Sequence, residues 1–167
     1  MNAKLDGEFR EFMHARWPFM VRLAYGLTGD QGHAEDVAQA AFARAYASWP
    51  RVSRAGDPDA YVRRIVVNEN RNRFRKHRVT ERLTDAPPEA AAADAVRCYD
   101  DRSVLIGALQ RLGPRQRAVI VLRYWMDLTE HETAASLNCS AGTVKSQASR
   151  ALATLRQDTE LVDEGFQ

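Results

Sequence analysis

Side chains that build metal centres and disulfide frameworks are scarce in this sequence, which holds 2 cysteines and 4 histidines among 167 residues. Cys98 and Cys139 lie far apart, and neither belongs to a Cys-x-x-Cys pair or a Cys/His cluster. Structural zinc sites and small disulfide-rich domains require such spacings. We therefore expect no metal, no cofactor and no disulfide framework, with Cys139 as a small, partly buried thiol.

The sequence motifs of common enzymes are missing as well. There is no P-loop, no GxGxxG, no GxSxG and no HExxH. His131 stands between Glu130 and Glu132, but adjacent residues of a helix point apart, so this triplet predicts a solvated helix start. We expect that the protein is not an enzyme.

Long apolar runs are absent too. No segment approaches the roughly 20 apolar residues of a membrane span, and the N-terminus lacks the apolar part of a signal peptide. We therefore expect a cytoplasmic protein that makes no contact with a membrane.

What the sequence does contain is an uneven distribution of charge. Residues 1–78 hold 14 basic and 9 acidic side chains, residues 79–101 hold 2 and 6, and residues 102–167 hold 8 and 7. The middle stretch is rich in proline and alanine and is typical of a linker. Elsewhere apolar residues recur at helical intervals, with no strand-period segment of useful length. We expect an all-α fold with two small helical domains, 1–78 and 102–167, joined by a flexible acidic linker.

The apolar spacing makes local predictions inside these domains. Pro18 should kink or restart the first helix. Tyr46 should face inward from a helix over residues 32–49. Residues 114–126 should form one helix, and the side chains that it exposes should be Arg115, Arg117 and Arg123.

A helix-turn-helix pattern spans residues 129–157, TEHETAASLNCSAGTVKSQASRALATLRQ. Thr129 with Glu132 three residues on is the signature of a helix start. Asn138 can adopt the left-handed conformation of a sharp turn, and Ser140 can cap the helix that follows. The apolar stripe of that second helix recurs at i, i+4, i+7 and i+11, as Val144, Ala148, Ala151 and Leu155.

The opposite face of this second helix is short, polar or cationic, with no acid between residues 140 and 156. Solvated helix faces usually mix Glu with Lys and Arg. An acid-free face favours a helix that lies in the major groove of DNA rather than a hairpin whose polar face is merely solvated. The side chains at helical spacing on this face are Thr143, Ser146, Gln147 and Arg150.

A strongly basic segment lies in the first domain, in DPDAYVRRIVVNENRNRFRKHR at residues 57–78. Asp-Pro is a typical helix start. From Arg63 to Arg78 the helix carries seven cations and one acid, Glu69, and such a run suits a polyanion partner. Interleaved asparagines add donors and acceptors for base edges. The alternative is a solvated helix end, where the helix dipole favours cations. This would explain the basic residues at 75–78 but not Arg63 or Arg64, which lie far from that end.

Together these segments resemble a bacterial RNA polymerase sigma factor of the extracytoplasmic function type, in the sigma-70 class. AEDVAQAAFARAY, residues 34–46, resembles region 2.2 of the family, and residues 57–78 resemble regions 2.3 to 2.4. Residues 112–156 resemble region 4, and TVKSQASRAL is similar to an actinobacterial, SigE-like subgroup. Thr133 departs from the family pattern, which usually has Ile or Val there.

The resemblance implies a role for each segment. The first domain would bind the coiled coil of the largest polymerase subunit through Asp36 and Gln39. The loop at 51–59 and the basic helix would engage and help open the −10 element, with Arg63, Arg64, Asn68, Arg71, Asn72 and Arg75 as candidates. The second domain would dock on the polymerase flap and read the −35 element with Ser140, Thr143, Lys145, Ser146, Gln147 and Arg150.

The partners that the resemblance implies are RNA polymerase core and promoter DNA. Relatives are often held by an anti-sigma factor, which would be a further partner seated between the two domains. The protein alone should bind DNA weakly, because polymerase fixes the spacing of its two DNA-reading helices. One alternative is a stand-alone helix-turn-helix regulator, which predicts polymerase-independent binding to duplex DNA. A protein-binding helical adaptor is another, but it would not need the acid-free face.

Overall fold

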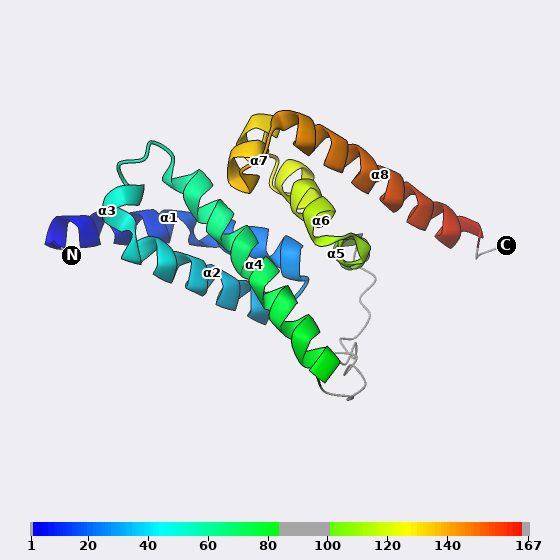
Figure 1. Cartoon of the computed structure of the whole chain (residues 1–167), viewed down its shortest axis with the longest axis horizontal. Helices are drawn as coiled ribbons and strands as arrows, with labels where there is room; N and C mark the ends of the chain where they lie inside the picture. The colour runs from blue at the N-terminus through cyan, green and yellow to red at the C-terminus, as the bar shows by residue number, and fades with distance from the viewer. Residues whose placement is uncertain (1, 84–100, 165–167) are drawn as a thin grey trace.

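A computed structural model of the chain describes residues 2–83 and 101–164. Within these two ranges the chain is helical apart from short turns, and no strand occurs there (Figure 1). The first unit contains α1 (Ala3–Thr28), α2 (Gln31–Ala47), α3 (Trp49–Val52) and α4 (Pro58–Leu83). The second contains α5 (Asp101–Arg111), α6 (Pro114–Ile120), the π-helical turn η1 (Val121–Trp125), α7 (Glu130–Leu137) and α8 (Ala141–Glu164).

Helix α1 passes through Pro18 without ending, so the predicted restart there is wrong. Proline in a helix interior costs roughly 3 kcal/mol, because it removes a hydrogen bond and crowds the preceding turn. Here Pro18 lies on the exposed side, while Phe9, Met20 and Leu23 are buried on either side of it. Burial of these flanking residues against α2 offsets the cost, and the helix continues until Gly29 ends it with φ 71°.

Helix α4 begins as predicted and ends later than predicted. The Asp57 carboxylate accepts a hydrogen bond from the backbone N–H of Ala60 at 2.9 Å, which caps the helix start. At the other end the helix continues five residues beyond Arg78, to Leu83. The pair His77–Glu81, at i and i+4 and 3.1 Å apart, supports this extension. Of the rest of the predicted linker, residues 84–100 lie outside the described residues and Asp101 begins α5.

Residues 114–126 do not form the single regular helix that the spacing predicts. After Ile120 the backbone widens into η1, and the N–H of Met126 donates to the carbonyl of Val121 at 2.9 Å. Arg117, which was expected at the surface, is only 6% exposed. Arg117 precedes the wider turn, and its guanidinium is held inside by hydrogen bonds to the carbonyls of Leu27, Leu109 and Leu112, which helical periodicity cannot anticipate.

The helix-turn-helix forms with the predicted local chemistry. Thr129 and Glu132 make both hydrogen bonds of a capping box at the start of α7. Asn138 adopts the left-handed conformation, with φ 53°. The hydroxyl of Ser140 accepts a hydrogen bond from the N–H of Thr143 at 3.1 Å at the start of α8. Cys139, in the turn, is a half-buried free thiol, as expected.

The hydrophobic core does not stop at the boundary between the two units. One continuous cluster joins Phe42 and Trp49 in the first unit to Leu109, Leu122 and Ala151 in the second. Figure 1 shows α7 beside the upper part of α4, and α6 on the same side of that helix. The two units therefore pack directly against each other in this structure.

Candidate nucleic-acid interface

Helix α8 presents the predicted recognition face to the outside. Its stripe of Val144, Ala148 and Ala151 is buried against the rest of the second unit. The residues of the opposite face that are exposed are Ser140, Thr143, Lys145, Ser146 and Arg150, while Gln147 is half-buried. Lys145 lies 3.6 Å from the carboxylate of Glu130 in α7, but exposed ion pairs of this kind are weak and exchange readily for a phosphate.

The basic face of α4 divides into two parts. Near its N-terminus, Arg63 is only 6% exposed and its Nε donates to the hydroxyl of Ser136 in α7 at 2.9 Å. At the next residue along the chain, an Nη of Arg64 donates to the backbone carbonyl of Ala135 at 2.8 Å. These two arginines were expected to face DNA, but in this structure both donate hydrogen bonds to α7 of the second unit. The sequence does not predict this contact, because alanine and serine are common in helices and nothing about Ala135 or Ser136 indicates that they bind arginine side chains.

The second part of the basic face remains open to solvent. Asn68 and Arg75 are exposed, and Arg71 and Asn72 are half-buried. Arg71 and Arg75 line a cleft of about 550 Å³ whose far wall belongs to the second unit. The residues that line this cleft are Arg71, Phe74, Arg75, Arg78, Gly113, Pro114, Arg115, Gln116 and Gln147. The structure thus brings candidates for both promoter elements into one basic cleft.

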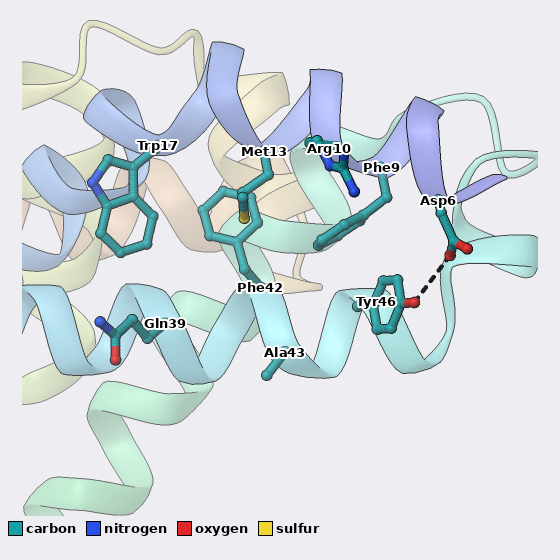
Figure 2. Close-up of a pocket in the computed structure, with 9 residues that line it drawn as sticks. All are labelled: Asp6, Phe9, Arg10, Met13, Trp17, Gln39, Phe42, Ala43 and Tyr46. Atoms are coloured by element: carbon teal, nitrogen blue, oxygen red, sulfur yellow. Dashed lines mark hydrogen bonds between the residues drawn. The ribbon is translucent and has the colours of Figure 1, made fainter. Parts of the chain in front are cut away.

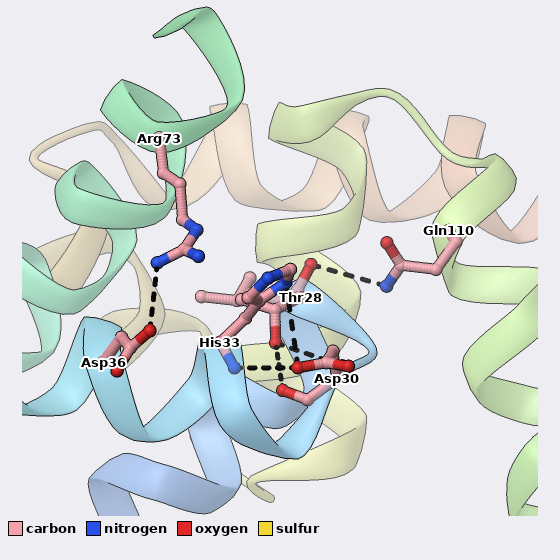
Figure 3. A network of polar contacts seen from close by, with 7 residues as sticks. Thr28, Asp30, His33, Asp36, Arg73 and Gln110 are labelled. Carbon is pink, nitrogen blue, oxygen red and sulfur yellow. Dashed lines mark hydrogen bonds and ion pairs between the residues drawn. The ribbon is translucent and has the colours of Figure 1, made fainter. Parts of the chain in front are cut away.

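The candidate polymerase-binding residues lie on the exposed face of α2. Asp36 pairs with Arg73 of α4 at 3.6 Å, and its carboxylate remains largely exposed (Figure 3). The same figure shows Gln110 of α5 reaching the end of α1, where its amide donates to the carbonyl of Leu27 at 3.4 Å. Asp30 caps α2 by accepting from the N–H of His33 at 2.8 Å. Asp36 therefore lies on a well-capped helix, and its carboxylate makes a weak ion pair with Arg73.

Gln39 stands at one end of an apolar groove between α1 and α2 that was not predicted from the sequence (Figure 2). The groove has a volume of about 530 Å³. Its apolar walls are Phe9, Met13, Trp17 and Phe42. At the other end the Tyr46 hydroxyl donates to Asp6 at 2.9 Å, and this hydrogen bond raises the pKa of Tyr46.

The prediction that Tyr46 faces inward is wrong, because its side chain is 41% exposed. Helical spacing places it beside Phe42 and Trp49, but the α1–α2 groove is open at this point. The recurrence of Phe9, Met13 and Trp17 every four residues was the available signal for the groove, although the same spacing fits an ordinary core helix.

Among the described residues, no group of three or more His, Cys, Asp or Glu side chains is arranged to hold a metal ion. Within the same residues, no helix is both long and apolar enough to cross a membrane. The features that the structure does provide are a helix-turn-helix, a basic helix and an exposed polar helix with an apolar groove beside it. These define a helical nucleic-acid-binding protein with two units.

Comparison with known proteins narrows this class. Residues 13–80 match the family "Sigma-70 region 2" and residues 108–157 match "Sigma-70, region 4". The RNA polymerase sigma-E factor of Streptomyces coelicolor is 40% identical over 151 residues, which cover 90% of this chain and 85% of that protein. The sigma-E factor of Streptomyces antibioticus is 39% identical over 156 residues, covering 93% and 87%.

The chain therefore belongs to the sigma-70 family of RNA polymerase sigma factors, among the SigE-like extracytoplasmic function group. The fold agrees with a solved member. The sigma factor RpoE of Bartonella quintana, crystallised with the anti-sigma factor NepR, matches with a TM-score of 0.72 at 23% identity. That match covers 90% of this chain and 95% of the solved one.

Proposed function

We propose that this protein binds RNA polymerase core and directs it to a specific set of promoters, reading a −10 and a −35 element and helping to open the duplex. The observation that carries the proposal is the presence, in one chain, of regions 2 and 4 with an acid-free recognition face on α8. Direct readout by a helix in the major groove needs such a face.

The residue assignments belong to the same proposal. Asp36 and Gln39 contact polymerase core, and the exposed side of α8 from Ser140 to Arg150 contacts the −35 element. The exposed part of α4, with Asn68, Arg71, Asn72 and Arg75, contacts the −10 element, and Arg63 and Arg64 extend this surface when they are available. Unpaired bases captured during opening need stacking and hydrogen-bonding partners. Arginine guanidinium planes can stack on bases, and both arginine and asparagine can hydrogen-bond to base edges.

The domain assignment and the setting follow from this function. We assign residues 1–78 to core binding and −10 recognition, 79–101 to the connection, and 102–167 to −35 recognition, with α4 continuing into the connection. The protein acts in the cytoplasm, where polymerase and chromosome are found, and it supplies promoter specificity rather than catalysis. An anti-sigma factor is a further partner, as it is for the Bartonella quintana sigma factor.

Run-off transcription tests the proposal. RNA polymerase core is combined with this protein and a library of upstream fragments from the source genome, with core alone as the control. We expect transcripts from a defined subset of fragments only when the protein is present. A stand-alone regulator would instead protect a duplex by itself and leave core inactive on every fragment, which would contradict the proposal.

A further inference from the structure

Four arginines face the cleft between α4 and the second unit. Arg71, Arg75 and Arg78 recur at i, i+4 and i+7 along one face of α4, and Arg115 lies across from them at the start of α6. Among the described residues, no acidic side chain lines the cleft and none of the four arginines forms an ion pair. Such a concentration of unneutralised positive charge favours an anionic ligand.

The cleft continues into a smaller and more enclosed pocket of about 170 Å³. The two spaces adjoin, because Arg71, Arg115 and Gln147 line both of them. The apolar walls of the inner pocket are Ala118, Val119 and Leu137. This volume has room for a nucleobase, and the shared arginines lie at its mouth.

Two side-chain amides, those of Asn138 and Gln147, also line the inner pocket. Neither side chain makes a hydrogen bond to any other residue that the structure describes. An amide presents a donor beside an acceptor, and this pair matches the N6 and N7 edge of adenine. Apolar walls with a few polar groups are typical of small-molecule sites. The inner pocket therefore has the lining that a purine base requires.

The size of the cleft favours a mononucleotide over a nucleic acid. Its volume of about 550 Å³ lies within the range of about 300–1,000 Å³ that small-molecule sites occupy. A double helix is too wide to enter it, and a single strand continues on both sides of every base. A mononucleotide can place its base in the inner pocket and leave its phosphates in the outer cleft, where guanidinium groups bind phosphate oxygens in pairs.

We propose that this cleft binds a purine nucleoside polyphosphate, with the base against Asn138 and Gln147 and the phosphates on Arg75, Arg78 and Arg115. The negative charge of the polyphosphate offsets the mutual repulsion of the arginines. The nucleotide is a ligand of the free chain and not a substrate. The inference therefore goes beyond the proposed function and depends neither on polymerase nor on a promoter.

Isothermal titration calorimetry of the full-length protein with ATP, in the absence of polymerase, tests the site. We expect the wild type to bind one ATP per chain. Arg78→Ala and Arg115→Ala each remove a charged donor and should weaken ATP binding about tenfold. Arg82→Ala, an exposed arginine of the same helix that lies outside the cleft, is the matched control and should change the affinity less than about twofold. No binding by the wild type, or an equal loss for Arg82→Ala, would overturn the site.

Inorganic tripolyphosphate distinguishes a nucleotide site from a site for phosphate alone. We expect the wild type to bind tripolyphosphate about tenfold more weakly than ATP, because the base contributes contacts of its own. Gln147→Leu should weaken ATP binding about tenfold and leave tripolyphosphate binding unchanged. Equal affinity of the wild type for the two ligands would show that the inner pocket holds no base, and the nucleotide assignment would fall.

A single-stranded oligonucleotide of six deoxyadenosines tests the competing occupant. We expect it to bind more weakly than ATP and to be insensitive to Arg115→Ala. Tighter binding than ATP, with a loss of affinity for Arg115→Ala, would make the cleft a surface for a nucleic-acid strand and contradict the proposal.

Nuclear magnetic resonance of the wild type provides a readout that needs no variant. ATP should shift the side-chain amide signals of Asn138 and Gln147 but not those of Gln39, which lies in the α1–α2 groove. The opposite pattern of shifts would place ATP elsewhere and overturn the site. Run-off transcription tests the sigma-factor function separately. Promoter-directed transcription by a protein that binds no ATP would reject the nucleotide site alone, and ATP binding without transcription would reject the sigma-factor function alone.

Discussion

At the scale of single residues, Arg117 shows most clearly how a charged side chain can organise the interior. Its guanidinium donates to the carbonyls of Leu109, Gln110 and Leu112 at 2.9 to 3.1 Å, and to Leu27 at 3.1 Å. Burial lowers its pKa from the ordinary value. One cation therefore satisfies carbonyls at the ends of two helices, α5 and α1, where helix dipoles favour positive charge.

Replacing this side chain should therefore destabilise the protein substantially. Arg117→Met fills similar volume but removes one donor from each of four carbonyls, of which Leu27 keeps the Gln110 amide and Leu109 keeps the N–H of Leu112. Hydrogen bonds to charged groups contribute about 1.5–3 kcal/mol each. Because water can replace some of these bonds in the variant, we expect a total loss of about 3 kcal/mol in the free energy of unfolding. Urea unfolding should show this loss for Arg117→Met, and no more than about 0.5 kcal/mol for the exposed neighbour Arg115→Met. Equal stability of the two variants would contradict this role.

Thr133 also departs from expectation at this scale. It is fully buried in α7, where the resemblance predicted Ile or Val, and its hydroxyl has no hydrogen-bond partner. The Nε of Arg64, in the neighbouring contact with α4, is likewise buried without a partner. Each unpaired group of this kind costs about 1–3 kcal/mol. These unpaired groups lower the stability of the packing around α7.

At the scale of elements, the start of α7 is sensitive to pH. The N–H of Thr129 donates to the Glu132 carboxylate at 2.8 Å, and this hydrogen bond lowers the pKa of Glu132 in the folded state. A carboxyl group whose folded pKa is depressed contributes stability above its unfolded pKa of about 4.3 and loses it as pH falls through the folded pKa. The capping box should therefore weaken in acid.

Glu132→Gln isolates this effect, because glutamine can still accept the Thr129 hydrogen bond but does not titrate. We expect the urea midpoint of the wild type to fall more steeply below about pH 4.3 than that of Glu132→Gln. The two profiles should run parallel near neutral pH, where Glu132 stays ionised. Profiles that remain parallel in acid would show that Glu132 titrates normally.

Helix α8 carries the second prediction at this scale. Lys145 and Arg150 are exposed on the recognition face and each can neutralise a phosphate. Lys145→Ala or Arg150→Ala should each weaken promoter binding by the polymerase complex and reduce the slope of log affinity against log salt by about one. Arg156→Ala, on the same helix but about three turns beyond Lys145 and outside the 140–150 recognition segment, is the matched control. An equal change in slope for Arg156→Ala would reject the assignment of the face.

At the scale of the whole molecule, two small units share one hydrophobic core. Each unit is near the lower size limit for a stable helical domain, so burial against the other unit stabilises both. The same packing joins the −10 and −35 surfaces across a basic cleft that contains Arg71, Arg75, Arg78 and Arg115. Like charges held together in this way repel each other, so the cleft suits a polyanion that would neutralise them.

The elements of the fold were largely predictable from sequence because local chemistry specifies them. Asp57, Thr129, Asn138 and Ser140 act at helix ends through their own backbone neighbours, and an apolar stripe identifies the buried side of α8. Exposure of most of the −35 candidates on α8 followed from the same stripe. Their contact with DNA, like that of the other candidate residues, stays a prediction.

The sequence by itself determined the all-α fold, most helix boundaries and the family, since these depend on short-range spacing and on motifs read along the chain. Only the tertiary structure decided that Arg63, Arg64 and Arg117 are engaged, that α1 continues through Pro18, and that η1 interrupts the helix after Ile120. Each of these depends on partners distant in sequence, such as Ser136 for Arg63 and Leu27 for Arg117. Periodicity reports which side of a helix is buried, but not which other helix covers it.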